Sequence, residues 1–329
     1  MFEGTGQRMR GLVVWLRGPW RGAILIRWVF DRSSRATAVR MLAHEDVDGI
    51  TARVGLSYGS LGSHTTLDLF APTAAAAPLP AVVWIHGGAW ISGRKEDAAP
   101  YARLIAAHGY VAASLNYTVS PEAVYPTAIT QLNSALAHLV SHAAEYNIDP
   151  SRIILAGDSA GAQLASQLAN LTTNPSFAAE MALVPALAPE QLRAVILNCG
   201  VFDVKDIRFA RGVDGWGFRR ALHAYFGVKQ WWDTPGGVHM STIDHVTSNF
   251  PPTWISGGNA DALTRTQSIP FAARLRSLGV PVTSLFFPRE HRPRTPHEYQ
   301  FHLRRPDARR ALASTLEFLE AVTRVRVAG

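Results

Sequence analysis

Cysteine, charge and unbroken apolar runs are all scarce in this chain of 329 residues. Cys199 is the single cysteine, so no internal disulfide can form, and a cytoplasmic setting is favoured over an oxidising compartment. Charged residues make up 17% of the chain and hydrophobic residues 47%, a balance that excludes a disordered or collagen-like protein. At about 100–200 residues per domain, the length fits one large domain or two small ones with a sizeable core.

The net charge of +7 is concentrated in two segments rather than spread along the chain. Residues 1–40 hold eight arginines against two acidic residues, and residues 289–310 hold seven arginines against three acidic residues. The rest of the chain carries a net negative charge. No signature of a nucleic-acid-binding module accompanies the basic segments, so we expect no nucleic-acid partner.

The most apolar stretch, Gly11 to Phe30, is interrupted by Arg17, Arg21 and Arg27. A membrane-spanning helix needs about 20 mostly apolar residues, and a central arginine costs about 2.5–3.5 kcal/mol, so this stretch is not expected to span a membrane. We expect two short helices that meet at Gly18-Pro19, with Pro19 opening the second. Residues 1–40 are therefore predicted as an amphipathic helical segment that precedes the main domain, 41–329. Two interpretations stay open: a cap packed on that domain, and attachment to a membrane surface.

After the first 50 residues, apolar strand-like segments alternate with helix-like segments. Two early segments, near 51–57 and 65–70, predict an antiparallel start. Further strands are expected at 81–86, 110–117, 152–157, 193–199, 252–257 and 281–287, and helices from Pro126 to about Ala143 and at 163–171, 266–278 and 307–322. This order is typical of the α/β class, with a mostly parallel sheet covered by helices on both faces.

Residues 203–250 separate two expected strands by more than one crossover helix requires, and they are rich in aromatic residues. An insertion of this kind at a strand end is a candidate lid or substrate wall. The alternative is that the rings fill a small core of the insertion itself. Trp216 and Phe218 are its candidates for a substrate pocket.

The pattern Gly-x-Ser-x-Gly occurs twice, and its context separates the two matches. The first, Gly55 to Gly59, leads into turn residues and a strand, so Ser57 is predicted as a hairpin residue. The second, Gly157 to Gly161, follows a strand and leads directly into a helix. Such a turn holds its serine in a strained conformation, and glycines on both sides let strand and helix approach closely. Ser159 is therefore the predicted nucleophile.

A serine nucleophile needs hydrogen-bond donors for the charge that develops on the substrate oxygen. The loop His86-Gly87-Gly88-Ala89-Trp90 follows an expected strand and can present free backbone N–H groups. We expect Gly87, Gly88 and Ala89 to form an oxyanion hole with Ala160, with Gly88, Ala89 and Ala160 as the donors. His86 is predicted to brace this loop, and Trp90 is a further pocket candidate.

The acid and the base are expected after the serine in chain order. Asp261 follows the strand at 252–257 in a glycine-rich loop, and we favour it over Asp203, which fits an Asx-type turn. Three histidines follow the last expected strand. His297 lies in a loop long enough to return to the strand ends, whereas His291 lies among arginines and His302 is closer to the final helix. His297 is therefore the predicted base.

The segments HGGAW and GDSAG, with Asp261 and His297 in their contexts, resemble the α/β-hydrolase superfamily over about residues 45–325. The chain is most similar to bacterial carboxylesterases of the hormone-sensitive-lipase-like and feruloyl-esterase-like groups, above all from Trp84 to Glu122 and in PHEYQF. This resemblance implies an α/β-hydrolase fold, with an eight-stranded, mostly parallel sheet and helices on both faces. It also implies a cap from the N-terminus or the 203–250 insertion, and a serine hydrolase without a cofactor.

We expect this machinery to hydrolyse short- to medium-chain carboxylic esters through an acyl-enzyme, since an alkoxide leaves more easily than an amine. Because the HGGxW form also occurs in kynurenine formamidases, an arylformamidase-type amidase is the main alternative; a catalytically silent binding protein is another. No cluster with metal-ligand spacing is evident, and Cys199 is predicted as a small buried hydrophobe. A small-molecule ester is the expected partner, while a homo-oligomer and membrane contact through residues 1–40 stay open.

Overall fold

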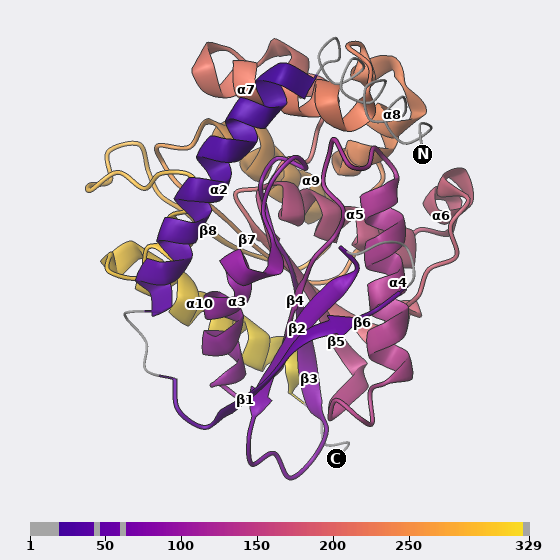
Figure 1. Ribbon diagram of the computed structural model, residues 1–329, viewed down its shortest axis with the longest axis vertical. Helices are drawn as coiled ribbons and strands as arrows, with labels where there is room; N and C mark the ends of the chain where they lie inside the picture. Colours follow the sequence, from indigo (N-terminus) through magenta and orange to yellow (C-terminus); the bar gives the residue numbers. More distant parts are fainter. Residues whose placement is uncertain (1–19, 43–46, 60–63, 325–329) are drawn as a thin grey trace, which may run out of the picture.

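The computed structural model describes residues 20–42, 47–59 and 64–324, and an eight-stranded sheet runs through their centre (Figure 1). The strand order is β1-β2-β4-β3-β5-β6-β7-β8. The strands are β1 (Ile50–Ser57), β2 (Thr66–Pro72), β3 (Leu79–Ile85), β4 (Val111–Leu115), β5 (Ile148–Asp158), β6 (Leu192–Asn198), β7 (Thr253–Gly257) and β8 (Val282–Phe286). β2 is antiparallel to β1 and β4, and all the other pairs are parallel. The predicted mostly parallel sheet with an antiparallel start is confirmed.

Helices cover both faces of the sheet, as predicted (Figure 1). The helices are α2 (Trp20–Leu42), α3 (Lys95–Ala106), α4 (Thr127–Ser141), α5 (Ala160–Thr173), α6 (Pro175–Met181), α7 (Gly212–Phe226), α8 (Pro235–Met240), α9 (Ile269–Ser277) and α10 (Pro306–Thr323). Alternate residues of the strands point to opposite faces. Val83 and Leu155 pack with α4, α5 and α9, whereas Trp84 and Ala156 pack with α3, α10 and the end of α2.

The helices differ from the sequence interpretation in several places. α2 runs from Trp20 to Leu42, directly after Pro19, while the first expected N-terminal helix lies outside the described residues. The helix expected at 266–278 begins with a π-helical turn (Thr264–Ser268) before α9, because Pro270 has no N–H to continue the regular ladder. α3 and α6 were not predicted from the sequence. In the part of the chain that is described, no helix has both the length and the apolar character needed to cross a membrane.

The insertion between β6 and β7 contains α7, α8 and three short helical turns, Lys205–Phe209, Trp231–Asp233 and Thr242–Asp244. Some of its aromatic residues are buried and others are exposed. Tyr225 and Trp231 are buried in the core, whereas Phe209 and Trp216 are exposed. α7 also packs beside the first half of α2, above the loop that follows β3 (Figure 1). The insertion therefore fills its own core and also helps to cover the carboxyl ends of the strands.

Candidate active site

Ser159 occupies a sharp turn between β5 and α5. Its backbone has φ 51° and ψ −116°, a strained conformation for a residue with a side chain. The flanking glycines are sterically required, because a Cβ on Gly161 would lie 2.0 Å from the Ile85 carbonyl oxygen, and one on Gly157 would lie 2.5 Å from the Gly161 backbone. In contrast, Ser57 ends β1, and its hydroxyl donates to the Gly59 carbonyl at 3.3 Å.

The structure brings Ser159, His297 and Asp261 together at the carboxyl ends of the parallel strands. Asp261 follows β7, and His297 follows β8. His297 Nε2 lies 3.0 Å from Ser159 Oγ, and His297 Nδ1 lies 2.8 Å from Asp261 Oδ2. The other carboxylate oxygen of Asp261 accepts the backbone N–H of Leu263 at 2.9 Å, which fixes the orientation of the carboxylate. This is the geometry in which a histidine can take the serine proton while a carboxylate holds its ring.

The environment of His297 favours its protonated form. Burial lowers the pKa of His297, but the Cys199 sulfur and the Asp261 carboxylate raise it, and the balance lies well above 6.5. Burial also raises the pKa of the Cys199 thiol, so this thiol is neutral at neutral pH and Asp261 carries the attraction there. The imidazolium formed during proton transfer is therefore stabilised.

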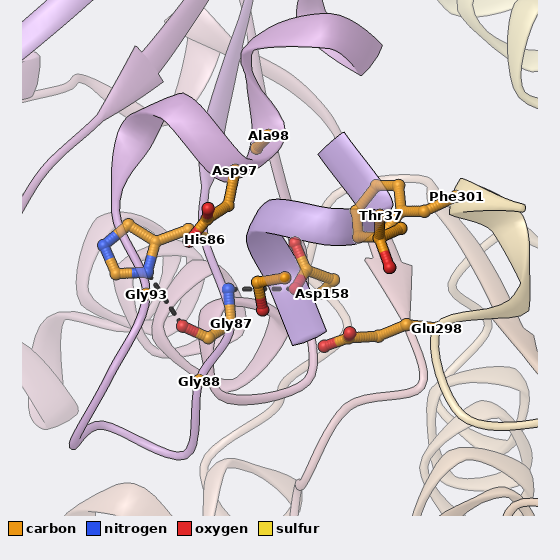
Figure 2. Close-up of a pocket in the computed structure, with 11 residues that line it drawn as sticks. Thr37, His86, Gly87, Gly88, Gly93, Asp97, Ala98, Asp158, Glu298 and Phe301 are labelled. Carbon is orange, nitrogen blue, oxygen red and sulfur yellow. Dashed lines mark hydrogen bonds between the residues drawn. The ribbon is translucent and has the colours of Figure 1, made fainter. Parts of the chain in front are cut away.

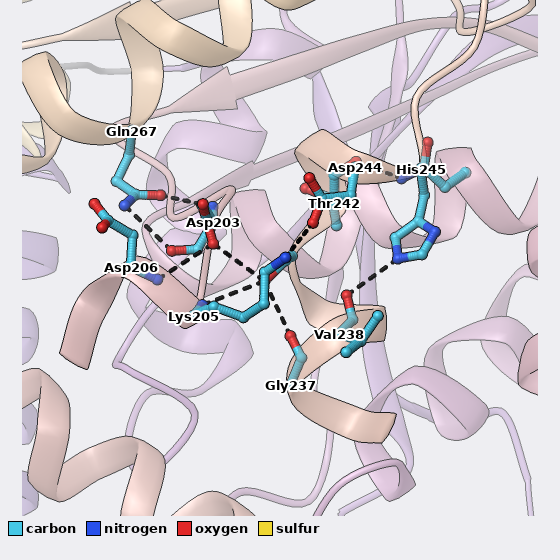
Figure 3. Close-up of polar contacts among 11 residues, drawn as sticks. Asp203, Lys205, Asp206, Gly237, Val238, Thr242, Asp244, His245 and Gln267 are labelled. Carbon is cyan, nitrogen blue, oxygen red and sulfur yellow. Dashed lines mark hydrogen bonds and ion pairs between the residues drawn. The ribbon is translucent and has the colours of Figure 1, made fainter. Parts of the chain in front are cut away.

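The carboxylate of the rival acid, Asp203, forms hydrogen bonds within the 203–250 insertion instead. The Asp203 carboxylate accepts from the Asp206 backbone N–H at 3.2 Å (Figure 3). It also accepts from Ser241 Oγ at 3.3 Å. Its own backbone N–H donates to Gln267 Oε1 at 2.7 Å. These are the contacts of a turn residue.

The two rival histidines are also engaged elsewhere. His291 Nε2 contacts Asp307 Oδ2 at 2.9 Å. The backbone N–H of His302 donates to Tyr299 within the short helical turn Tyr299–Phe301, just before α10. His297 is the histidine that reaches Ser159.

The loop after β3 supplies the oxyanion-hole candidates. Gly88, Ala89 and Trp90 all have positive φ, at 103°, 51° and 60°. Among the described residues, no protein acceptor takes the N–H of Gly88, Ala89 or Ala160. β3 and β5 are paired neighbours, with Ile85 opposite Gly157, so these three N–H groups lie in adjacent turns. They can donate to a substrate oxygen.

Gly87 does not belong with the donors. Its N–H donates to Asp158 Oδ2 at 2.9 Å, so the prediction that includes Gly87 in the oxyanion hole is wrong for its N–H group. Its role is to anchor the loop. His86 has the contacts of a bracing residue: Nδ1 lies 2.8 Å from the Gly87 carbonyl oxygen, and the ring stacks on Tyr117 at 4.3 Å. Burial lowers the pKa of His86 to about 4, so its ring stays neutral at neutral pH.

The three pocket candidates lie in different environments. Trp90 has no exposed surface, and its Nε1 donates to Gln163 at 3.1 Å, so it supports the loop from behind, contrary to the expectation that it lines the pocket. Trp216 is 43% exposed on α7, where the Arg220 guanidinium lies over its ring. Phe218 packs against the apolar cluster between α2, α7 and the oxyanion loop.

The N-terminal helix is attached to the oxyanion loop. Arg27 of α2 donates to the Ile91 and Ser120 carbonyl oxygens. It also forms a two-point ion pair with Glu122, with nitrogen–oxygen distances of 2.8 and 2.6 Å. Beside it, Ala23 and Ile26 form one apolar cluster with Ala89, Ile91, Ala221 and Ala224. Sequence reasoning missed this contact, because nothing local to Arg27 indicates its partners.

One group of metal-ligating side chains lies close together in the described part of the chain. The ligating atoms of Cys199, Asp261 and His297 are all within 4.8 Å of one another. Cys199 is fully buried at the end of β6, as predicted, but its proximity to the base was not expected. Two of the three residues already form the serine–histidine–aspartate arrangement, so we assign the group to proton transfer.

Comparisons with known proteins agree with this geometry. The BD-FAE family model matches residues 67–275, more than half of the chain. Esterase LipQ of Mycobacterium tuberculosis is 29% identical over 239 residues, which are 70% of this chain and 54% of LipQ. The chain spans about half the length of the first curated relatives it matches.

Solved structures show the same architecture. Esterase B from Lactobacillus rhamnosis superimposes with a TM-score of 0.80 at 21% identity, over 92% of this chain and 96% of that chain. A bacterial heroin esterase superimposes with a TM-score of 0.71 at 25% identity, over 90% of this chain and 91% of that chain. The expected α/β-hydrolase fold is confirmed.

Proposed function

Since the chain belongs to the BD-FAE family, we propose that it hydrolyses small carboxylic esters through a covalent acyl-serine intermediate. The observation that carries this proposal is the hydrogen-bonded series from Ser159 through His297 to Asp261, at 3.0 and 2.8 Å. Three N–H groups without a protein acceptor lie beside it in the described structure. The esterase names of the relatives support the same reaction.

Each step uses a named group. Ser159 Oγ attacks the ester carbonyl carbon while His297 Nε2 takes its proton. Gly88, Ala89 and Ala160 donate to the oxygen that becomes negative. The protonated His297 then gives its proton to the departing alkoxide, which leaves as the alcohol. Water then attacks the acyl carbon while His297 Nε2 takes a proton from it. The imidazolium returns this proton to Ser159 Oγ as the acyl C–O bond breaks, and the carboxylic acid leaves.

The direct test is covalent labelling and turnover. We expect a fluorophosphonate to label the wild type, and Ser159→Ala to abolish both labelling and hydrolysis of p-nitrophenyl butyrate. Ser57→Ala, at the other Gly-x-Ser-x-Gly match, is the matched control and should retain both. A folded wild-type protein that takes no label would identify a silent binding protein instead.

Substrate choice is tested on the same protein. α2 and α7 pack beside the oxyanion loop, and this supports a partly covered pocket and a preference for short to medium acyl chains. Each buried methylene adds about 0.8 kcal/mol until the chain meets a wall. We expect p-nitrophenyl acetate to hexanoate to be the best substrates. Faster turnover of palmitate esters would contradict this preference, and N-formylkynurenine outpacing every ester would favour the arylformamidase alternative.

The N-terminal segment is assigned the same covering role. The contacts of Ala23, Ile26 and Arg27 with the oxyanion loop support a cap, and we expect removal of residues 1–40 to alter substrate preference. The outer side of α2 exposes Leu25, Trp28 and Val29, which keeps the membrane alternative testable. If the full chain floats with anionic vesicles and Trp28→Ser does not, residues 1–40 attach to membranes rather than form a cap.

A further inference from the structure

A small cavity lies beneath the oxyanion loop, and Asp158 and Glu298 are two of the three acidic residues that line it. Its volume is about 30 Å³, enough for one or two water molecules. Figure 2 shows Asp158, which precedes the nucleophile, beside Gly87, with Glu298, which follows the base, on the far side of Asp158. The esterase mechanism above uses neither carboxyl group.

Asp158 is held by both of its oxygens. Oδ1 accepts from Trp84 Nε1 at 2.8 Å, and Oδ2 accepts from the Gly87 N–H at 2.9 Å. The residue is 4% exposed, and its carboxyl group lies beside the carboxyl group of Glu298, close enough for a hydrogen bond between them. Two carboxylates are acceptors only, so a hydrogen bond between them requires that one carries a proton.

Glu298 comes from the other side of the site. It has φ 55°, a left-handed conformation that is unfavourable for a residue with a side chain. Its Oε1 lies 3.8 Å from His297 Nε2. Gly87 packs closely against both acids, because a Cβ there would lie 2.3 Å from Asp158 Oδ2 and 3.1 Å from Glu298 Oε1.

We propose that Asp158 and Glu298 share one proton, and that this carboxyl–carboxylate hydrogen bond holds the oxyanion loop in register with the loop that carries His297. The inference rests on the proposed esterase function. Through Gly87, Asp158 fixes the loop that presents Gly88 and Ala89. Glu298 is thus a positioning residue, which sets the place of the base relative to the donors.

The buried setting supports a retained proton. Burial raises the pKa of Asp158 well above its usual value, and the charge of Glu298 raises it further. Two carboxylates this close repel each other when both are ionised. The shared proton removes that repulsion while Trp84 and Gly87 keep their acceptors.

Other titratable groups face the pair from every side and must be separated from it in a test. His86 and Asp97 line the same cavity, from the end of β3 and from α3. His297 and Cys199 lie on the nucleophile side, and His302 also interacts with the charge of Glu298. α2 contributes Ser34 and Thr37, which do not titrate in the working range.

The proposal predicts a loss at alkaline pH. When the shared proton is removed, the two carboxylates repel, and the loops that carry the donors and the base separate. Activity and stability should then both fall as pH rises, because the folded state binds a proton that the unfolded chain has already lost. His297 acts on the acidic side of the profile, where its own protonation removes the base.

The experiment compares Glu298→Gln with Glu298→Ala from about pH 6 to about pH 10. A glutamine can donate its amide N–H to an ionised Asp158 at every pH, so Glu298→Gln should lower kcat only a few-fold at neutral pH and lose the alkaline fall. Glu298→Ala cannot make the contact and should lower kcat by about ten-fold or more, with KM changed much less. Glu290→Gln removes an exposed carboxylate from the same connection and should behave as the wild type.

Two outcomes would overturn the proposal: equal alkaline profiles in the wild type and Glu298→Gln, or Glu298→Gln as impaired as Glu298→Ala. The melting temperature measured over the same range gives an answer that does not depend on turnover. If the protein hydrolyses no ester, the proposed function fails. The shared proton would still require the wild type, but not Glu298→Gln, to lose thermal stability at alkaline pH.

Discussion

His297 Nε2 lies 3.0 Å from Ser159 Oγ, although 138 residues separate the two along the chain. The contact forms because β5 and β8 belong to one sheet, so the turns that follow them meet at one edge. The order of the strands, rather than proximity in sequence, therefore assembles the base and the nucleophile.

Asp261→Asn should lower kcat by about 10³–10⁴ and leave KM within a few-fold, because an amide can no longer hold the required tautomer of His297. Asp203→Asn is the matched control, since the insertion binds that carboxylate, and it should cost far less. Steady-state kinetics on p-nitrophenyl butyrate decide between them. If Asp203→Asn lowers kcat more than Asp261→Asn does, the assignment of the acid is wrong.

The acidic side of the pH profile should report His297. The base must be neutral to accept the serine proton, and the Asp261 carboxylate raises its pKa against the effect of burial, so kcat/KM should fall on the acidic side as His297 becomes protonated. Asp261→Asn removes the carboxylate that raises this pKa while burial still lowers it, so the residual activity should extend to lower pH. An acidic limb that does not move in this variant would contradict the role given to Asp261.

Gly161→Ala should destabilise the fold. Its methyl group would lie 2.0 Å from the Ile85 carbonyl oxygen, so α5 would have to move away from β3. We expect the free energy of unfolding to fall by about 2–4 kcal/mol. Gly217→Ala, in α7 with open space around it, should be neutral or slightly stabilising. Urea denaturation of the two variants measures the difference, and equal effects would count against the close approach of α5 to β3.

Arg27→Met should lower kcat by about ten-fold, since it frees the carbonyl groups of Ile91 and Ser120 and leaves the oxyanion loop less firmly placed. Arg32→Met, on the exposed side of the same helix, should have little effect; its guanidinium lies 6.0 Å from the Trp28 ring. Kinetics on a single ester distinguish the two. Similar losses in both variants would mean that general destabilisation of α2, and not the loop contact, is responsible.

Features that depend on neighbouring residues were predictable from the sequence. The turn at Ser159 needs glycines two positions away on each side, and the chain has them at 157 and 161. The donor loop is likewise a local pattern directly after a strand. Alternating apolar segments also predicted most strands to within a few residues, because the central strands bury both faces under helices.

Position in space decided the rest. Asp261 and Asp203 both follow a strand of the sheet. The glycine-rich loop favours Asp261, and the contacts of Asp261 with His297 and of Asp203 with the insertion decide between them. The sequence predicted a free N–H at Gly87, but in the folded chain this group donates to Asp158, which lies 71 residues away in sequence. Arg27 reaches Glu122 across 95 residues.

The sequence alone determined the fold class, the nucleophile and the donor loop, because strand patterning and glycine sterics act over a few residues. The tertiary structure decided the identity of the acid, the attachment of α2 to the oxyanion loop, and the meeting of Asp158 with Glu298. Each of these depends on which strands are neighbours in the sheet and where the connecting loops turn. No local pattern in the chain carries that information, because hydrogen bonds and charge contacts between distant segments form only once the sheet is assembled.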